Sequence, residues 1–507
     1  MYSVLLSIII FLPLAGAIAL LFFPAARVTA ARWTALGIAG LNLLLAFLLM
    51  LLYLQSTVGL FSTSPFEEYV TWIAPLGINY SLDVDGISLL LVVLTALLTL
   101  VCIGASFRIE HRVKHYMAFM LFLECGMLGV FLATNLFLFY IFWELMLIPA
   151  YFLVGTWGGE RRVYAVFKFV LYTSVGSLLM LAGIIALGYY HQAAGGGFTL
   201  DLATLLKGKL SSGIQIWLFL AFAAAFAVKV PFVPFHSWLP DAYCEAPAPV
   251  TAMLAGAMAK TGAYGFLRIC IPLFPQAAQT LAPLFNILAI ISILYCAVLA
   301  LVQADFKRLL AYSSISHLGV IMLGMFAFNA QGAEGSVLQM VNHGITITAL
   351  FLIAYYFEER TGTRRLSDFG GLAVRVPVLA TVALIAALSS LGLPGLNSFA
   401  GEFLSLLGAF RSSTVFGILG TAVVIPAAWY MLRFFQGITW GATQRVGPVA
   451  AALRKGTLGD MSLGEFLPLL PLLILIFYIG LQPAPLTSIL EPSVFNALQS
   501  LGNAFIK

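Results

Sequence analysis

Charge is scarce in this sequence: Asp, Glu, Lys and Arg make up only 9% of its 507 residues, while hydrophobic residues make up 62%. The mean hydropathy is +1.04. About a quarter of the residues in a water-soluble domain are charged, so this composition excludes a water-soluble protein. Apolar stretches of about 20 residues, long enough to cross roughly 30 Å of hydrocarbon, recur along the whole chain. The composition therefore predicts an integral membrane protein that crosses the bilayer many times.

Cysteines and cofactor motifs are also scarce. The five cysteines lie mostly inside apolar stretches and form no CxxC pair, which argues against disulfides, zinc and iron–sulfur clusters. The chain has no GxGxxG motif after a strand, and Ala259 stands where a phosphate loop requires the glycine before its lysine. We therefore expect no cofactor in this chain, and any electron transfer must take place in other proteins.

The number of apolar stretches predicts an all-α, polytopic membrane protein with about fourteen transmembrane helices. The first stretch lacks a basic n-region and a small-residue cleavage site, so we expect it to remain as a helix rather than to be removed as a signal peptide. The helices are expected at residues 2–23, 33–54, 86–106, 116–133, 136–156, 164–190, 214–230, 249–271, 281–302, 309–328, 337–357, 379–410 (interrupted), 414–435 and 466–481.

Basic residues gather on alternate loops between these stretches. The positive-inside rule assigns the face that carries them to the cytoplasm, which places both chain termini on the outer side. Lys207 and Lys209 are the exceptions on the opposite face. The net charge of +5 follows from this bias, so it does not indicate a nucleic-acid partner. The basic residues of the predicted cytoplasmic face are Arg27, Arg32, Arg108, Arg112, Lys114, Arg161, Arg162, Lys307, Arg308, Arg360, Arg364, Arg365, Arg445, Arg454 and Lys455.

Two of the predicted spans are broken by proline and glycine in a related way. The first break leads into His236-Ser-Trp-Leu-Pro-Asp241 and the second into Asn397-Ser-Phe-Ala-Gly-Glu402. Matching breaks in two halves of a chain are typical of transporters built from structural repeats, with the ion path at the breaks, although a chance match is the alternative. Broken backbone in a membrane must line a cavity or be buried in protein, so we expect water there.

These breaks divide the chain into four predicted segments. They are residues 1–110, a group of N-terminal helices; residues 111–275, a first five-helix repeat broken near 231–240; residues 276–436, a second repeat broken near 391–401; and residues 437–507, a C-terminal helix.

Ionisable residues inside the apolar spans are the candidates for chemistry, because each is costly in hydrocarbon unless it is paired, hydrated or functional. Glu144 stands alone in a long apolar stretch, and Lys229 falls just before the first break. Lys260 lies about eleven residues into its span, or roughly 16 Å from its end, which is too deep for snorkelling. A protonated structural carboxyl at Glu144 and a snorkelling Lys229 are the alternatives to function.

A buried ammonium is stabilised by a nearby carboxylate, so moving that carboxylate can switch the proton of the lysine. We therefore predict that Glu144 pairs with Lys229 and that loosening of the pair sends a proton from Lys229 toward Lys260.

Three residues of the second repeat could continue this path. His317 and His343 suit relay steps because imidazole gains and loses its proton near neutral pH, although a lone buried histidine is more often structural. Glu402, after the second break, is the candidate carboxylate on the exit side.

Other charged residues receive weaker predictions. Glu124 either extends the acidic end of the path or pairs with a neighbour. Asp83 and Asp85 are expected to cap the span that they open. The residues near span ends, for which snorkelling or loop pairing is expected, are Lys168, Asp241, Arg268 and Arg433.

At residues 142–149, 229–242, 304–317 and 392–403 the sequence resembles the antiporter-like subunits shared by proton-pumping NADH:quinone oxidoreductase (complex I) and by multisubunit sodium/proton antiporters. The resemblance covers nearly the whole chain and implies inverted repeats around discontinuous helices. Related chains usually carry lysine at the position of Glu402, so glutamate there favours one particular member. The residues through which the resemblance implies proton translocation are Glu144, Lys229, Lys260, His317, His343 and Glu402.

The resemblance also implies partners. These are the other membrane-arm subunits, including homologous antiporter-like ones, together with lipids and protons carried by internal water in a bacterial inner membrane. Flavin, iron–sulfur clusters and ubiquinone or menaquinone would belong to partner subunits. A sodium/proton antiporter subunit, a subunit of a membrane-bound hydrogenase or ferredoxin-driven complex, and a stand-alone solute carrier remain the alternatives.

Overall fold

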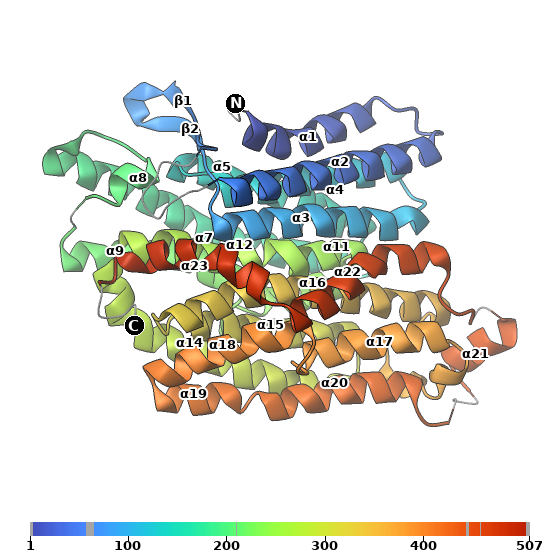
Figure 1. Ribbon diagram of the computed structural model, residues 1–507. Helices are drawn as coiled ribbons and strands as arrows, with labels where there is room; N and C mark the ends of the chain where they lie inside the picture. The colour runs from blue at the N-terminus through green and yellow to red at the C-terminus, as the bar shows by residue number, and fades with distance from the viewer. Residues whose placement is uncertain (1–3, 57–64, 209, 443–445, 457, 503–507) are drawn as a thin grey trace.

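The computed structural model describes residues 4–56, 65–208, 210–442, 446–456 and 458–502. Helices dominate these residues, and the long helices lie side by side and roughly parallel in one bundle (Figure 1). Lys209, Arg445 and the start of the first predicted span at residues 2 and 3 lie outside the described residues.

Eleven helices in this part of the chain are long and apolar enough to cross a bilayer, which confirms the predicted helical membrane fold. Shorter helices complete the bundle, so the predicted total of fourteen spans stays a prediction. The long helices, two of them composite, are α2 (Val28–Gln55), α3 (Gly86–Ala105), α4 (Val113–Leu132), α5 with α6 (Leu136–Leu145 and Leu147–Trp157), α7 (Arg162–His191), α9 (Ser212–Lys229), α14 (Pro275–Val302), α15 (Phe306–Met325), α16 (Ala330–Thr361), α19 with α20 (Thr414–Thr421 and Val424–Thr439) and α22 (Leu463–Leu481). The shorter helices are α1 (Leu5–Leu21), α8 (Leu202–Leu205), α10 (Trp238–Glu245), α11 (Ala248–Met253), α12 (Lys260–Gly265), α13 (Ile271–Leu273), α17 (Pro377–Ser390), α18 (Asn397–Ser412), α21 (Pro448–Lys455) and α23 (Ala484–Gln499).

A β-hairpin was not predicted from the sequence. Strands β1 (Glu68–Ile73) and β2 (Ile78–Leu82) pair antiparallel at the end of the bundle where the N-terminus lies (Figure 1). Glu68 is buried and accepts a hydrogen bond of 2.7 Å from Leu6 N, so it satisfies an amide that the first turn of α1 leaves free.

Helix α23 was also not predicted, because the last apolar stretch ends with α22. It packs against α3 and α16, and Ser493 accepts a hydrogen bond of 2.8 Å from Gly86 N at the start of α3. The C-terminal segment is therefore built into the bundle.

Both predicted breaks are present. Helix α9 ends at Lys229 and α10 begins at Trp238, with non-helical backbone between them. The Trp238 indole donates a hydrogen bond of 3.0 Å to Val228 O, so a side chain satisfies a carbonyl near the interruption. The second break separates α17 from α18, where Gly392 (φ +71°) and Gly395 (φ +94°) take left-handed conformations that favour glycine.

The stretch around Lys260, predicted to be one continuous span, is interrupted as well. π-helical turns at Leu254–Met258 and Phe266–Cys270 flank α12 on both sides. Such turns shift the backbone hydrogen-bond pattern locally and are frequent at functional sites.

Helix α16 lies at the centre of the bundle. All 18 residues of its most apolar window are buried, and it contacts α3, α11, α15, α17, α18, α22 and α23. The predicted division of the chain into four segments is not decided by these helix boundaries and stays a prediction.

Candidate functional site

Helix α16 carries a row of polar side chains on one face, because Gln339, Asn342, His343 and Thr346 are spaced by three or four residues. All four are buried. Buried polar groups in a membrane-spanning helix require partners. Their hydrogen-bond partners come from α12, α17 and α18.

Lys260 is 0% exposed at the start of α12. Its ammonium nitrogen lies 2.7 Å from His343 Nδ1, and it donates a second hydrogen bond to Ala255 O. Ala255 belongs to the π-helical turn before Lys260, so the irregular backbone supplies an acceptor. His343 Nδ1 accepts from the ammonium, while His343 Nε2 is buried without a hydrogen-bond partner in the described residues.

His317, on α15, is buried, and both of its ring nitrogens have partners. Nδ1 lies 2.7 Å from Glu402 Oε1 on α18, and Nε2 lies 3.2 Å from the Tyr430 hydroxyl on α20. Gln339 Nε2 donates to the same Glu402 oxygen at 2.9 Å. The ring centroids of His317 and His343 are 5.7 Å apart, so the two imidazoles lie next to each other at the centre of the bundle.

Lys229 and Glu144 form a separate part of the site. The Lys229 ammonium is buried 5.3 Å from the Trp143 ring centroid and 5.7 Å from that of Phe169, where cation–π attraction acts on it. Neither Lys229 Nζ nor Glu144 Oε1 has a hydrogen-bond partner in the described residues, and no ion pair within 4 Å joins them there. The predicted direct pair is thus open in this structure.

Glu144 also faces a surface cavity of about 380 Å³ on the side of α5, α6 and α7. Tyr151, Val170 and Ser174 line it with Glu144. Glu144 therefore lies beside open space at the surface of the bundle.

The structure brings together four of the six predicted site residues and leaves two apart. Lys260, His343, His317 and Glu402 follow one another through the contacts above, whereas Lys229 and Glu144 lie on α9 and α5 outside this row. Two residues that hydrogen-bond to this row were not predicted from the sequence, namely Gln339, which contacts Glu402, and Tyr430, which contacts His317. Gln339 could have been found, since it lies four residues before His343 on the same face, but Tyr430 is remote in sequence and no local pattern marks it.

Asn397 opens α18 and ties the second break to α16. Its Nδ2 donates to Asn342 O at 3.1 Å, and its Oδ1 accepts from Ser389 at 2.6 Å. Asn342 Nδ2 returns a hydrogen bond of 2.7 Å to Asn397 O. Asn342 directly precedes His343, and Asn397 begins the helix that carries Glu402. These hydrogen bonds therefore fix the position of α18, and with it Glu402, relative to His343.

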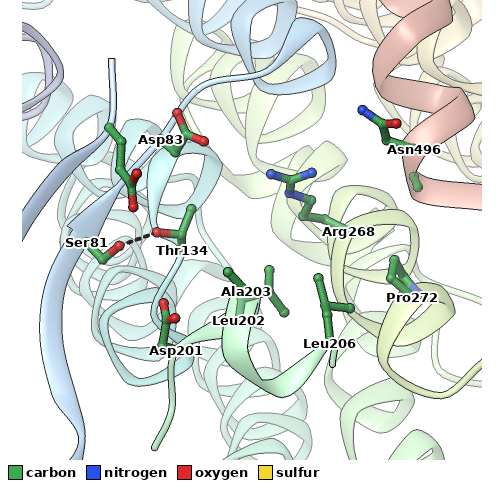
Figure 2. Close-up of a pocket in the computed structure, with 12 residues that line it drawn as sticks. Ser81, Asp83, Thr134, Asp201, Leu202, Ala203, Leu206, Arg268, Pro272 and Asn496 are labelled. Atoms are coloured by element: carbon green, nitrogen blue, oxygen red, sulfur yellow. Dashed lines mark hydrogen bonds between the residues drawn. The ribbon is translucent and has the colours of Figure 1, made fainter. Parts of the chain in front are cut away.

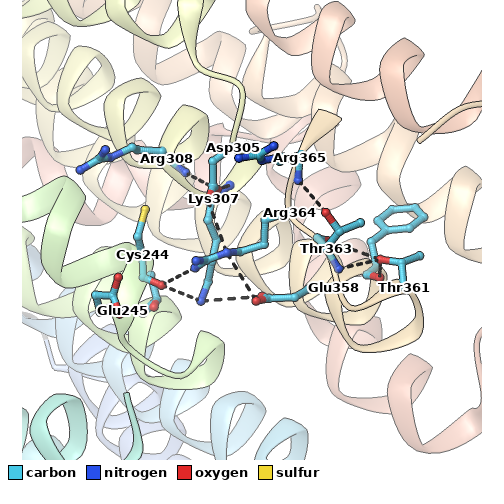
Figure 3. Close-up of polar contacts among 12 residues, drawn as sticks. Cys244, Glu245, Asp305, Lys307, Arg308, Glu358, Thr361, Thr363, Arg364 and Arg365 are labelled. Carbon is cyan, nitrogen blue, oxygen red and sulfur yellow. Dashed lines mark hydrogen bonds and ion pairs between the residues drawn. The ribbon is translucent and has the colours of Figure 1, made fainter. Parts of the chain in front are cut away.

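A charged cluster ties the end of α10 to the second half of the chain (Figure 3). Lys307 Nζ donates at 3.0 Å to a carbonyl just past α10 and lies 3.9 Å from Glu358 Oε2. Arg364 donates to Cys244 O at 2.7 Å. Burial lowers the pKa of Arg364, but Asp305 and Glu358 raise it above its ordinary value, so the group stays charged. Cations at the carbonyl end of a helix are favourable, and α10 is anchored there.

The predicted pairing near span ends is found for Asp241. Lys168 on α7 and Arg308 on α15 bind its two carboxylate oxygens at 2.8 and 2.6 Å. Glu124 pairs with a neighbour as well, because Asn42 Nδ2 donates to it at 2.8 Å, so the structure favours the second of its two interpretations.

At the opposite end of the bundle, Asp85 caps α3 as predicted by accepting from Ser88 N at 2.9 Å. It also pairs with Arg268 at 2.8 Å. Arg268 borders a cavity of about 330 Å³ near β2 and α8, whose polar lining includes Asp83 and Asp201 (Figure 2).

A bundle of long apolar helices with two broken ones, and a buried row of lysine, histidine and glutamate between them, defines an antiporter-like membrane subunit. The family described as "NADH:quinone oxidoreductase/Mrp antiporter, TM" matches residues 133–425, and the chain belongs to this family.

Individual relatives match over the whole length. The NADH-quinone oxidoreductase subunit M of Rhodobacter capsulatus is 39% identical over 98% of this chain and 96% of its own. A chain of respiratory complex I from Thermus thermophilus with bound NADH is 33% identical, with a TM-score of 0.87 over 98% of this chain and 100% of its own. A chain of the Mrp complex from Dietzia sp. shares the fold, with a TM-score of 0.85 at 22% identity over 99% of both chains.

Proposed function

We propose that this chain is subunit M of a proton-pumping NADH:quinone oxidoreductase and translocates protons while partner subunits transfer electrons. The observation that carries the proposal is the buried row Lys260, His343, His317 and Glu402, whose members contact one another from α12 to α18. Each of these groups can take up and release a proton, and such groups persist inside a membrane when they are functional.

Glu144 and Lys229 supply the switch in this proposal. When the carboxylate lies close, the Lys229 ammonium is stabilised; when it moves away, the proton is free to pass toward Lys260. The unpartnered Lys229 nitrogen and the cavity beside Glu144 support this reading, since they match the open form of the pair.

The proposal includes the surroundings of the chain. The partners are the other membrane-arm subunits, including the homologous antiporter-like ones, together with lipids and protons carried by internal water. Flavin, iron–sulfur clusters and quinone are assigned to partner subunits, and no cofactor to this chain. The location is the bacterial inner membrane, with both termini on the outer side, as the distribution of basic loops supports.

The test is to isolate the native assembly in mild detergent and to ask whether oxidation of NADH by quinone copurifies with this chain. Copurification with flavin and iron–sulfur proteins is expected. If the chain instead travels with small membrane subunits and no redox protein, it is a sodium/proton antiporter subunit. If it copurifies with a hydrogenase or a ferredoxin-oxidising protein, NADH is not the electron donor of the complex and that part of the proposal is wrong.

A further inference from the structure

The step from His343 to His317 meets an obstacle in this structure. Glu402 occupies His317 Nδ1 and the Tyr430 hydroxyl occupies Nε2, so a proton arriving from His343 finds no free nitrogen. His343, by contrast, ends in a buried Nε2 that has no partner in the described residues. His343 thus has a free nitrogen from which a proton can leave, whereas both nitrogens of His317 already have partners.

The two partners of His317 are held differently. Glu402 lies 2.7 Å from Nδ1 and its Oε1 is fixed by a second donor, Gln339, at 2.9 Å. The Tyr430 hydroxyl makes a longer contact of 3.2 Å, and in the described part of the chain His317 is its one hydrogen-bond partner. Tyr430 is 0% exposed. A buried hydroxyl with one partner and a free lone pair can give up one proton while it accepts another.

We propose that Tyr430 is a member of the proton path and that its hydroxyl is the entrance to His317. This inference rests on the proposed relay and adds to it a residue on α20, outside the six predicted from the sequence.

The proton balance of the step is complete. Lys260 passes a proton to His343 Nδ1, and His343 releases its Nε2 proton through one bridging water to the oxygen of Tyr430. As the oxygen accepts, the hydroxyl proton moves to His317 Nε2, and the Nδ1 proton of His317 moves to the Glu402 carboxylate. One proton has then moved from Lys260 to Glu402, and Tyr430 is again a neutral phenol.

The step also leaves both histidines in the opposite tautomer. The Tyr430 hydroxyl must turn, and the rings must regain their starting tautomers, before a second proton can follow. Until this reset Tyr430 cannot donate to His317 again, so the hydroxyl limits the row to one proton at a time.

The test uses the whole complex in inverted membrane vesicles, with NADH-driven proton uptake followed by a pH-gradient dye and NADH oxidation followed in parallel. Three variants are compared: Tyr430→Phe, Tyr243→Phe as the matched control, and Lys260→Met as the reference for a cut relay. Tyr243 is equally buried, and its hydroxyl has no hydrogen-bond partner in the described residues. We expect Tyr430→Phe to lower proton uptake at least tenfold and Tyr243→Phe to stay within twofold of the native rate.

If Tyr430→Phe pumps like Tyr243→Phe while Lys260→Met is blocked, the relay stands and the role of Tyr430 is overturned. If Lys260→Met also pumps at the native rate, the proposed function itself fails.

A second measurement covers the case in which Tyr430→Phe does not assemble. Incorporation of 3-fluorotyrosine at position 430 keeps the ring and the hydroxyl but makes the hydroxyl release its proton more readily. We expect the alkaline limit of proton uptake to move to lower pH, because the phenol must be protonated to donate to His317. An unchanged pH profile means that Tyr430 only packs, and it overturns the inference.

Discussion

Two buried lysines in this chain should respond to the same substitution in opposite ways. Lys260 touches His343 and one carbonyl in the middle of the bundle, whereas Lys307 touches carbonyls at the end of α10 and approaches Glu358. Methionine has a similar length and volume but no charge, so Lys260→Met and Lys307→Met form a matched pair.

For Lys260→Met the fold should hold. The substitution leaves Ala255 O and His343 Nδ1 unpartnered, at about 1–3 kcal/mol each. It also removes a buried ammonium whose desolvation costs several kcal/mol, and the two effects roughly cancel. Proton transfer should suffer much more, because losing a positioned proton carrier costs about 10²–10⁴-fold in rate. That range corresponds to about 2.7–5.4 kcal/mol of activation free energy.

For Lys307→Met we expect the opposite result, a loss of stability with little effect on proton transfer. Its ammonium donates to Cys244 O at 3.3 Å and to Ala246 O at 3.0 Å, and hydrogen bonds to charged groups are worth about 1.5–3 kcal/mol each. The complex should therefore unfold at a lower temperature, while the protons taken up per NADH oxidised by the complexes that do assemble stay normal.

The assay compares assembly on native gels, thermal unfolding of the purified complex, and NADH-driven proton uptake for the two variants. Normal assembly of Lys260→Met with full proton uptake would refute the relay. A loss of proton uptake in both variants at equal stability would show that buried charge in general, and not the row of contacts at His343, sustains pumping.

Three further predictions concern the flanks of the relay. Glu144→Gln keeps the shape of the side chain but removes its charge, so proton uptake should fall at least tenfold in a normally assembled complex; native uptake would exclude the coupling role. Gly392→Ala adds a Cβ 2.9 Å from Glu402 Oε2 at a φ of +71°, and should lower the free energy of unfolding by about 1–2 kcal/mol, read as a lower melting temperature; an unchanged melting temperature would show that the break tolerates a side chain. Glu124→Gln can still pair with both polar atoms of Asn42 and should be neutral, whereas Glu124→Leu leaves the buried amide alone and should cost about 1–3 kcal/mol; equal melting temperatures for the two variants would show that the pair contributes nothing.

The sequence predicted those features that depend on local composition. Apolar stretches give helices because the length of a span is set by the bilayer, and the breaks at Lys229 and before Asn397 follow from proline and glycine, which cannot continue a helix normally. Ionisable residues stand out in so apolar a sequence, which is why the burial of Lys260 and His317 could be predicted from single positions, while their role stays a prediction.

What could not be predicted depends on contacts between distant segments. Tyr430 is 113 residues from His317, and nothing near it in the sequence distinguishes it from the other tyrosines of an apolar helix. The π-helical turns beside Lys260 are absent from the pattern as well, because hydropathy reports which residues are apolar and not how the backbone bonds. Whether Glu144 and Lys229 form an ion pair depends on the distance between the carboxylate and the ammonium, which their spacing in the sequence does not determine.

The anchor at the end of α10 holds the helix that follows the first break against the second half of the chain. The backbone is non-helical after Lys229, and α10, which follows this break, is hydrogen-bonded at its end by Lys307 from α15 and Arg364 from the loop after α16 (Figure 3). These hydrogen bonds join the end of α10 to the first turn of α15 and to the loop after α16, the helices that carry His317 and His343. One short helix is therefore both the covalent continuation of the first break and a hydrogen-bonded part of the second half of the chain.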